Sequence, residues 1–279
     1  MLLSIQVEEL VRTALQEDEA GDDVTSMALI PEDRYVTAEI IAKEKLILAG
    51  IEVAKLVFQY CDSEISFLFS RVDGETIEDK ECVLKVYGKA RAILTAERTA
   101  LNFLQRLSGI ATLTSKYVEK VKSYGVAILD TRKTTAGWRR LEKYAVRVGG
   151  GKNHRSSLRE AILIKDNHLA LSTTVEEAIS KARESASPLI KIEVEVDTLE
   201  QLEAALRAKA DIIMLDNMDI ETMTRAVKMV SKRALLEASG GVKLERVEKI
   251  ASTGVDFISI GALTHSARAV DLSLEVALS

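Results

Sequence analysis

The chain of 279 residues has few of the residues that mark secreted, disordered or membrane proteins. Its only cysteines are Cys61 and Cys82, too few for a disulfide scaffold, which favours a reducing cytoplasm. Two prolines and 29% charged residues argue against disorder. No apolar run reaches the roughly 18 residues that a membrane span needs. The acidic, amphipathic N-terminus lacks the basic-then-apolar order of a signal peptide.

Aromatic residues are also scarce, at 4%, and the formal net charge is −5. Nucleic-acid-binding proteins need cations and aromatic stacking platforms, so this composition ranks nucleic acid low among the partners. The hydrophobic fraction of 47% suits an ordinary core. The length suits two domains, or one barrel with an appendage.

The first third of the chain reads as helices and an antiparallel sheet. Val7 to Glu17 has helical apolar spacing, and Asp22 or Asp23 is placed to cap the next element. Segments 34–50, 64–77 and 81–94 are rich in Val, Ile and Leu and predict strands of one antiparallel sheet, with both cysteines in strands. Residues 95–122 predict a helix with a break at Gly109.

After Gly125 short apolar runs alternate with amphipathic helices, two of which have Thr198 and Asp219 at the N-cap position. The six runs are GVAILDTRK, EAILIKDNH, IKIEVEVDT, DIIMLDNMD, ALLEASGG and DFISIGAL. This pattern predicts parallel strands covered by helices, in an incomplete, six-to-seven-stranded α/β barrel. An open doubly wound sheet is the alternative, less favoured because no dinucleotide fingerprint follows any strand.

The carboxyl ends of parallel strands are where ligands bind in such folds. In chain order these ends carry cations, then acids, then glycines: Thr131, Arg132 and Lys133; Lys165 to His168; Glu193 and Glu195; Asp216 and Asn217; Ser239, Gly240 and Gly241; and Gly261. Cations match carboxylate and phosphate, glycines let backbone N–H groups approach a phosphate, and carboxylates hold sugar hydroxyls or a divalent metal. Together they indicate an anionic ligand with phosphate, carboxylate and sugar groups.

Several of these residues also have plainer interpretations. The DTRK segment could be a solvated strand end, and the GGGKN segment a flexible turn. His154 is equally compatible with a structural role and a ligand role. Trp138 and Leu141 are expected in a helix core, whereas Arg139, Arg140 and Lys143 are expected on its solvated face. The three widely spaced histidines show no metal-site pattern, and neither cysteine has a nearby His to make a catalytic thiol.

Taken in order, these motifs resemble the quinolinate phosphoribosyltransferase family. The likeness rests on AERTALNFLQRLSGIAT, DTRKTT, LEKYAVRVGGGKNHR and LIKDNH, together with ALQEDEAGDDVTS, EVEV, IMLDN, ASGG and SIGALTHSA. It implies an N-terminal α/β sandwich over residues 1–110 and a barrel over 111–265, with 266–279 able to pack on the first. It also implies transfer of a phosphoribosyl group from phosphoribosyl pyrophosphate to quinolinate, with Mg²⁺, in a cytoplasmic homodimer with shared active sites or a hexamer.

The resemblance implies a role for each matching residue. Quinolinate would contact Arg98 of the neighbouring chain together with Thr131, Arg132, His154, Arg155 and Lys165. Lys133, Glu195 and Asp216 would be catalytic and would hold the phosphoribosyl group. Mg²⁺ would bind mainly through the substrate pyrophosphate, with Glu195 and Asp216 as further ligands. The 5′-phosphate would lie against Ser239, Gly240, Gly241, Ile260, Gly261 and Ala262.

The sequence departs from the family pattern at Ala136, Val148, Ser157 and Glu160, none of which is a charged site residue that the pattern requires. Two rival functions stay open at this stage. One is that of a related protein encoded with molybdate transporters. The other is a non-catalytic barrel that binds phosphorylated metabolites.

Overall fold

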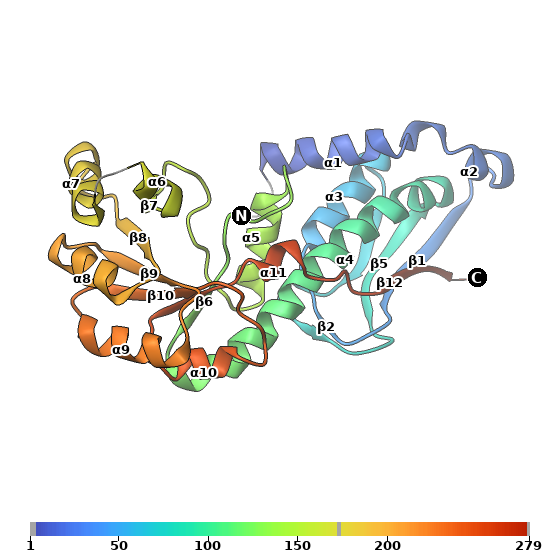
Figure 1. Cartoon of the computed structure of the whole chain (residues 1–279). Helices are drawn as coiled ribbons and strands as arrows, with labels where there is room; N and C mark the ends of the chain where they lie inside the picture. Colours follow the sequence, from blue (N-terminus) through green and yellow to red (C-terminus); the bar gives the residue numbers. More distant parts are fainter. Residues whose placement is uncertain (1–3, 172–173, 278–279) are drawn as a thin grey trace. The chain divides into compact units, whose positions relative to one another are not determined.

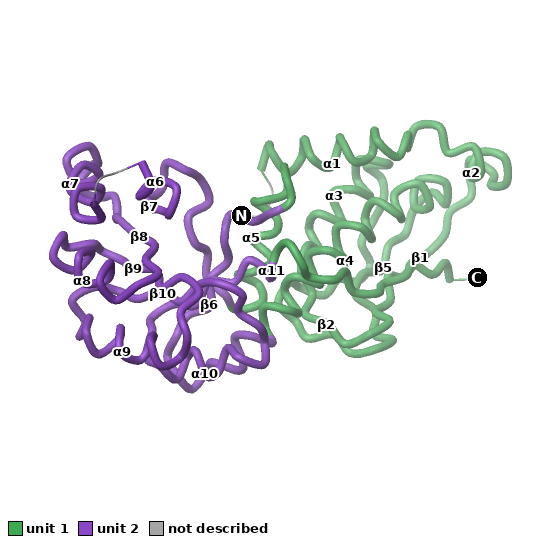
Figure 2. The backbone as a smooth tube through the Cα atoms, viewed as in Figure 1, with its two compact units in different colours: residues 1–115, 135–150, 264–279 green, residues 116–134, 151–263 purple. Residues whose placement is uncertain are grey.

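A computed structural model describes residues 4–171 and 174–277 of the chain. The chain forms two compact units, coloured green and purple in Figure 2. Unit 1 contains residues 1–115, 135–150 and 264–279, and unit 2 contains residues 116–134 and 151–263. Both units are therefore assembled from segments that are separated in the sequence.

Unit 1 contains a four-stranded antiparallel sheet in the order β12-β1-β5-β3. Its strands are β1 (Tyr35–Ala42), β3 (Ser66–Ser70), β5 (Cys82–Lys89) and β12 (Leu272–Ala277). The predicted strands are confirmed except over residues 90–94, which are helical, and they form two sheets and not one. β2 (Leu46–Ile47) and β4 (Thr76–Ile77) pair separately with each other.

The helices of unit 1 lie alongside this sheet, with α1 (Ile5–Glu17) against α3 (Ile51–Cys61) (Figure 1). A short 3₁₀ turn, η1 (Ala20–Asp22), leads to α2 (Val24–Leu29). Asp23 caps α2 as predicted, because its Oδ1 accepts the Ser26 N–H at 3.0 Å. Cys61 ends α3, so its predicted place in a strand was wrong. Ile51, Ala54 and Phe58 lie on one face of α3 and are buried. This helical spacing of buried residues explains why the segment forms a helix and not a strand.

Helix α4 (Ala90–Val121) runs through Gly109 without the predicted break. A Cβ at this position would overlap the Arg268 carbonyl oxygen and press on Ala269. Glycine is therefore needed for the close approach of another backbone segment, and the helix tolerates it at a cost of about 1 kcal/mol relative to alanine. Unit 1 also includes α5 (Arg139–Val148) and the end of α11 (Ala262–His265).

Unit 2 contains six parallel strands in the order β6-β11-β10-β9-β8-β7. These are β6 (Ala127–Leu129), β7 (Ile162–Ile164), β8 (Ile192–Val196), β9 (Ile212–Asp216), β10 (Leu235–Ser239) and β11 (Phe257–Ser259). Each lies in one of the six predicted runs. From β7 to β11 every strand pairs with the next in the chain, so the sheet has none of the reversal of a doubly wound sheet. β6 pairs with β11 but not with β7, which leaves the barrel incomplete, as predicted.

Helices α7 to α10 lie along the outside of these strands (Figure 1). After η2 (Lys122–Tyr124), the helices of unit 2 are α6 (Asp166–Ala170), α7 (Val175–Ser185), α8 (Leu199–Arg207), α9 (Ile220–Val230) and α10 (Val247–Ala251). The predicted N-caps are confirmed, since Thr198 Oγ1 accepts from Gln201 N at 3.2 Å and Asp219 Oδ1 accepts from Thr222 N at 2.7 Å. Among the described residues, no helix is long and apolar enough to cross a membrane.

Candidate active site

The predicted site residues of unit 2 gather at the carboxyl ends of its parallel strands. Thr131 to Lys133 follow β6, Lys165 follows β7, and Glu195 and Asp216 lie near or at the ends of β8 and β9. Ser239 ends β10, and Ile260 follows β11. The strands pair in parallel register, with Ser239 opposite Asp216, so these ends lie along one edge of the sheet. Across this edge the cations after β6 and β7 therefore lie at the two ends, the glycines after β11 and β10 follow those of β6, and the acids of β9 and β8 lie next to Lys165.

Asp130 brings the second cationic segment back to the end of β6. It is fully buried, its Oδ1 accepts the His154 N–H at 2.9 Å, and its Oδ2 accepts from Asn153 Nδ2. Lys152 adds two backbone hydrogen bonds, to Ile128 and Asp130. A carboxylate that accepts from the backbone in a buried setting holds a loop firmly. Arg132 and Arg155, which are 23 positions apart, are therefore anchored to the same strand end.

Arg132 and Arg155 form the most unusual electrostatic feature of this edge. Burial lowers the pKa of Arg155, and the positive charge of Arg132 lowers it further. Arg155 Nη1 donates to the Ala161 carbonyl at 2.8 Å, while the Nε atoms of both arginines are buried with no hydrogen-bond partner. No ion pair to either arginine is recorded over residues 4–171 and 174–277. The charge of Glu193 offsets part of this effect on the pKa of Arg155, but neither guanidinium forms an ion pair within the described part of the chain. Two such neighbouring guanidinium groups are suited to an anionic ligand.

His154 uses both of its ring nitrogens inside the protein. Nε2 lies 2.9 Å from Glu193 Oε2 and 3.7 Å from Glu237 Oε2, and Nδ1 accepts the Arg155 N–H at 2.8 Å. The role of His154 as a direct contact to quinolinate stays a prediction. Its ring lies between the cationic loop and two buried glutamates, one of which, Glu237, the sequence analysis did not single out.

Lys165, Glu195 and Asp216 form a mixed-charge group on or next to β7, β8 and β9, the three neighbouring strands at one end of the sheet. Lys165 Nζ lies 3.3 Å from Glu195 Oε2. Burial raises the pKa of Glu195, and the nearby charge of Asp216 adds to this effect, whereas Lys165 opposes it. Asp216 Oδ2 accepts from Asn217 Nδ2 at 2.8 Å. Two carboxylates this close to each other and to an ammonium group can accept sugar hydroxyls or share a divalent cation.

The turn after β10 contains two consecutive glycines in a left-handed conformation. Gly240 and Gly241 have φ angles of +96° and +55°, a region that side chains rarely adopt. A Cβ on Gly240 would also overlap the Asn217 side chain. Such turns form concave arrangements of N–H groups that bind anions. Gly261 and Ala262 follow the neighbouring strand β11.

The loop that follows Arg155 closes on itself. The Ser156 N–H donates to Glu160 Oε2 at 2.5 Å, so the carboxylate at position 160, one of the departures from the family pattern, has a structural partner. Ser157, another departure, is part-buried in the same loop.

Three residues with a predicted role lie in unit 1. Arg98 is exposed on α4, as a residue donated to another chain would be. Trp138 stacks on Phe103 with ring centroids 4.7 Å apart, in agreement with its predicted packing role. Lys143, however, is only 2% exposed, so its predicted place on a solvated helix face was wrong. The apolar stem of a lysine can be buried where its ammonium group has partners.

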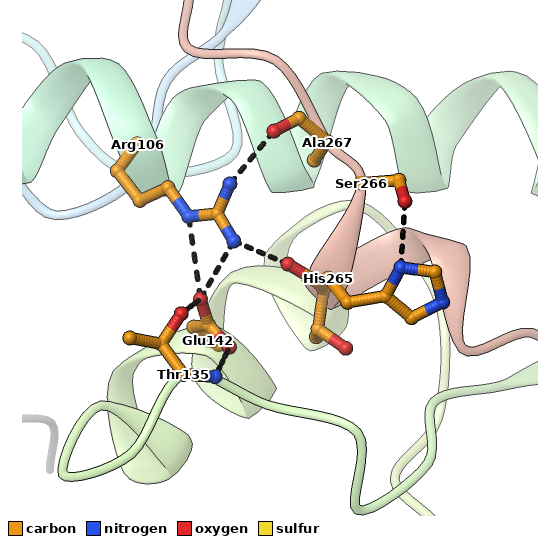
Figure 3. Close-up of polar contacts among 7 residues, drawn as sticks. Arg106, Thr135, Glu142, His265, Ser266 and Ala267 are labelled. Atoms are coloured by element: carbon orange, nitrogen blue, oxygen red, sulfur yellow. Dashed lines mark hydrogen bonds and ion pairs between the residues drawn. The ribbon is translucent and has the colours of Figure 1, made fainter.

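Figure 3 shows a polar network in unit 1 that the sequence did not reveal. Glu142 Oε1 accepts from Arg106 and from Thr135 Oγ1, and Glu142 Oε2 accepts the Thr135 N–H at 3.0 Å. Arg106 also donates to the carbonyls of Thr264 and Ala267. Thr135 comes two residues after Lys133, so the network fixes the chain just beyond the predicted catalytic lysine. A helical pattern alone cannot disclose such a pairing across 36 positions.

Of the two buried glutamates, the sequence pointed to Glu193 as a strand-end residue but not to Glu237. Glu193 and Glu237 are 3% and 1% exposed, on β8 and β10. Their signal was present in the sequence, because IEVEV and LLEAS place a charged residue within an apolar strand. Charged residues are almost never fully buried unless they are paired.

Comparison with known proteins gives a consistent result over the whole chain. The model for the quinolinate phosphoribosyl transferase N-terminal domain matches residues 23–108, and that for the C-terminal domain matches residues 110–275. A probable nicotinate-nucleotide pyrophosphorylase (carboxylating) of Bacillus subtilis is 42% identical, over 99% of this chain and 95% of that protein. The corresponding protein of Mycobacterium leprae is 43% identical, over 96% of each chain.

Solved structures agree in fold as well as in sequence. The nicotinate-nucleotide pyrophosphorylase from Francisella tularensis superposes with a TM-score of 0.93 at 43% identity, covering 98% of this chain and 96% of that one. Both domain models and close, nearly full-length relatives lead to one assignment, so this chain belongs to the quinolinate phosphoribosyltransferase family.

Proposed function

We propose that this protein transfers the phosphoribosyl group of phosphoribosyl pyrophosphate to quinolinate and releases carbon dioxide. The products are nicotinate mononucleotide and pyrophosphate, in a step of NAD biosynthesis. The observation that carries the proposal is the pair Arg132 and Arg155, two close guanidinium groups with no recorded ion pair among the described residues. A small dicarboxylate is the ligand class that neutralises such a pair. Relatives that are 42% and 43% identical carry the name of this activity.

The quinolinate site comprises Thr131, Arg132, Arg155 and Lys165 from one chain and Arg98 from a second chain, with His154 beside them. Arginine suits this task because its planar fork matches a carboxylate with two parallel hydrogen bonds. Neutralising both carboxylates would fix the ring with its nitrogen toward the sugar, and such positioning lowers the barrier of a two-substrate reaction.

The phosphoribosyl site comprises Lys133, Glu195 and Asp216, with the 5′-phosphate on the turns after β10 and β11. Ser239, Gly240 and Gly241 supply one turn, and Ile260, Gly261 and Ala262 supply the other. The positive φ angles of Gly240 and Gly241 support this assignment, because they expose N–H groups toward an anion. Ribose hydroxyls are suitable donors to Glu195 and Asp216.

Glu195 and Asp216 also fit a divalent cation. Hard carboxylate oxygens are the protein ligands that Mg²⁺ favours, and the cation keeps most of its other positions for water and substrate phosphates. Bound Mg²⁺ would offset the charge of the leaving pyrophosphate. The raised pKa of Glu195, caused first by burial and then by Asp216 within the group, supports a site where an added cation is favourable.

The reaction requires little general acid–base catalysis by the protein. The quinolinate ring nitrogen is itself the nucleophile, and positive charge develops on the ribose as pyrophosphate departs. Lys133 is positioned after β6 to stabilise the departing negative charge. Loss of carbon dioxide then leaves a carbanion beside the ring nitrogen, which is cationic at that stage and stabilises it, until this carbon takes up a proton from water and gives nicotinate mononucleotide. No covalent enzyme intermediate is required.

A homodimer accounts for the exposed position of Arg98 and for an apolar surface on unit 1. Val24 and Leu29 are 72% and 76% exposed. Leu29 also borders a hollow of about 430 Å³ lined by Ile30, Pro31, Val36 and Leu94, among others. Exposed apolar surface of this kind is typical of protein interfaces. A second copy that covers it would bring Arg98 to its neighbour's site.

The proposed activity is tested by incubating the purified protein with quinolinate, phosphoribosyl pyrophosphate and Mg²⁺ and measuring nicotinate mononucleotide and carbon dioxide. Nicotinate is the matched control, because it lacks the second carboxylate. Product from quinolinate and none from nicotinate supports the proposal. Equal use of nicotinate, or binding of quinolinate without turnover, would contradict it.

A further inference from the structure

Two glutamates in the interior of unit 2 have no part in the reaction described above. Glu193 and Glu237 lie on β8 and β10, on either side of β9, and both are almost fully buried. Glu193 Oε1 and Glu237 Oε1 have no hydrogen-bond partner among the described residues, and neither does Ser259 Oγ on β11. Burying a carboxylate is costly, so a pair of them needs a compensating function.

The two carboxylates converge on one ring nitrogen of His154. Glu193 Oε2 lies 2.9 Å from Nε2, and Glu237 Oε2 lies 3.7 Å from it. The other nitrogen, Nδ1, accepts the backbone N–H of Arg155 at 2.8 Å. An accepting nitrogen carries no proton, so the single proton of the neutral ring must be on Nε2, where Glu193 accepts it. The hydrogen bonds therefore define the tautomer.

The same reasoning argues against a metal ion bound by these three side chains. Their ligand atoms lie within 4.8 Å of one another, which is close enough for a cation. A metal on Nε2 would require the ring proton to be on Nδ1. Nδ1 already accepts from Arg155, so the observed hydrogen bond and a metal on Nε2 exclude each other.

We infer that Glu193 and Glu237 are positioning residues that hold His154 as the Nε2–H tautomer, and that His154 in turn holds Arg155 in place for the anionic substrate. The inference rests on the proposed function, because it assigns Arg155 to quinolinate. His154 thus acts by accepting the backbone N–H of Arg155.

The guanidinium of Arg155 must be held in place by other residues, because its surroundings disfavour a positive charge there. Burial and the neighbouring Arg132 both act against its charge, the charge of Glu193 offsets this only in part, and Nε has no partner. An unrestrained guanidinium would turn toward water and away from Arg132. The hydrogen bond to His154 fixes the backbone of Arg155, and the Ala161 carbonyl fixes its Nη1 end. The fork is thereby ordered before substrate binds, which reduces the entropy lost on binding.

Glu237 has a supporting role in this chain of contacts. Burial, followed by the negative charge of Glu193, raises its pKa from 4.5 to about 7. Near neutral pH it therefore holds a proton for part of the time, and the pair then carries one negative charge in place of two. A protonated Glu237 leaves Glu193 as the single charged acceptor for His154.

The first test observes the tautomer directly and does not depend on turnover. The protein has only three histidines, so NMR of the ¹⁵N-labelled imidazoles is assignable, with His154→Asn identifying the His154 signals. We expect a neutral His154 with its proton on Nε2 in the wild-type protein. A proton on Nδ1, a doubly protonated ring at neutral pH, or a stoichiometric metal in the purified protein would overturn the inference.

The second test separates positioning from general stability. Glu193→Ala should raise the KM for quinolinate roughly tenfold, the size expected when a buried group loses its partner, and change the KM for phosphoribosyl pyrophosphate little. Glu193→Gln retains an acceptor oxygen and should recover most of this loss. Val194→Ala is the matched control, because Val194 is a fully buried neighbour on the same strand. It should lower stability without a selective effect on quinolinate.

The outcomes distinguish failure of the inference from failure of the proposed function. Equal changes in both Michaelis constants would show that Glu193 serves only stability. Failure of glutamine to rescue, with the tautomer of His154 unchanged, would show that the charge of Glu193 acts on Arg155 directly and would overturn the role through His154. If Glu193→Ala does not fold, the tautomer of His154 in Glu193→Gln and in the wild-type protein decides the matter. An inactive wild-type protein with the expected tautomer would sink the proposed function and leave the geometric role of Glu193 intact.

Discussion

Arg106 and Glu142 form an ion pair at 2.8 Å although the Glu142 side chain is completely excluded from solvent. Removal of one partner from a buried pair leaves the other charge without compensation. We expect Arg106→Ala to lower the free energy of unfolding by about 3–5 kcal/mol, measured by urea denaturation. The carbonyls of Thr264 and Ala267 would lose their donor as well.

The matched control for this prediction is Arg207→Ala. Arg207 also lies 2.8 Å from its carboxylate, that of Glu176, but the two side chains are 63% and 39% exposed. Exposed pairs contribute little, about 0–1 kcal/mol, so this variant should stay close to wild type. Equal losses in the two variants would contradict the importance of burial.

The cationic pair predicts a selective loss of quinolinate binding. Arg155→Ala removes one charge-assisted hydrogen bond, so the KM for quinolinate should rise roughly 30-fold or more. Lys152→Ala is the control, because it removes an exposed cation from the same loop. An unchanged KM in Arg155→Ala, or an equal rise in both variants, would exclude Arg155 from the pocket.

The buried Glu237 predicts an unusual dependence of stability on pH. Its pKa is raised to about 7 from an ordinary 4.5, chiefly by burial and next by Glu193. Between these values the native state binds more protons than the unfolded state, so this residue lowers stability as pH rises through that window. The free energy of unfolding of Glu237→Gln should therefore exceed that of wild type by more at pH 8 than at pH 5. A difference independent of pH in urea unfolding would disprove the shift.

A shared active site predicts complementation between two inactive variants. Arg98→Ala and Arg132→Ala should each lose activity, and a mixture that is unfolded and refolded together should regain part of it. With random pairing, on the order of a quarter of the sites would be intact, since half of the dimers are mixed and each mixed dimer has one complete site. If Arg98 serves its own chain, mixing will restore nothing.

The turn after β10 predicts a defect specific to phosphoribosyl pyrophosphate. Gly240→Ala must strain the backbone at φ +96°, and its Cβ would also overlap the side chain and the backbone nitrogen of Asn217. It should therefore raise the KM for this substrate. Gly74→Ala is closely matched, because Gly74 has φ +95° but open space around the position of a Cβ. Both variants should lose stability, whereas only the first should lose substrate affinity.

The sequence was most informative about residues whose role follows from their residue type and from the local pattern around them. Parallel strands ending in polar residues were visible at Thr131, Lys165 and Asp216, because apolar runs end where solvent begins. Asp23, Thr198 and Asp219 were visible as helix caps for a similar local reason.

It was least informative where a role depends on a distant partner. Gly109 suggested a helix break, but its reason lies in the backbone at Arg268. Lys143 looked solvated because helical spacing does not tell which neighbours surround a face. The contact of His154 with Glu193, 39 positions away, forms only when the folded chain brings the two segments together. Periodicity contains no information about such pairings.

The last strand of unit 1 has a consequence for the order of synthesis. β12 pairs along β1 over Leu272–Ala277, yet the ribosome makes these residues only after all of unit 2. Until then the edge of β1 that β12 will cover has open N–H and carbonyl groups, and such an edge can pair with another chain. A nascent or shortened chain is therefore exposed to aggregation along β1 until residues near the end of this sequence arrive to cover it.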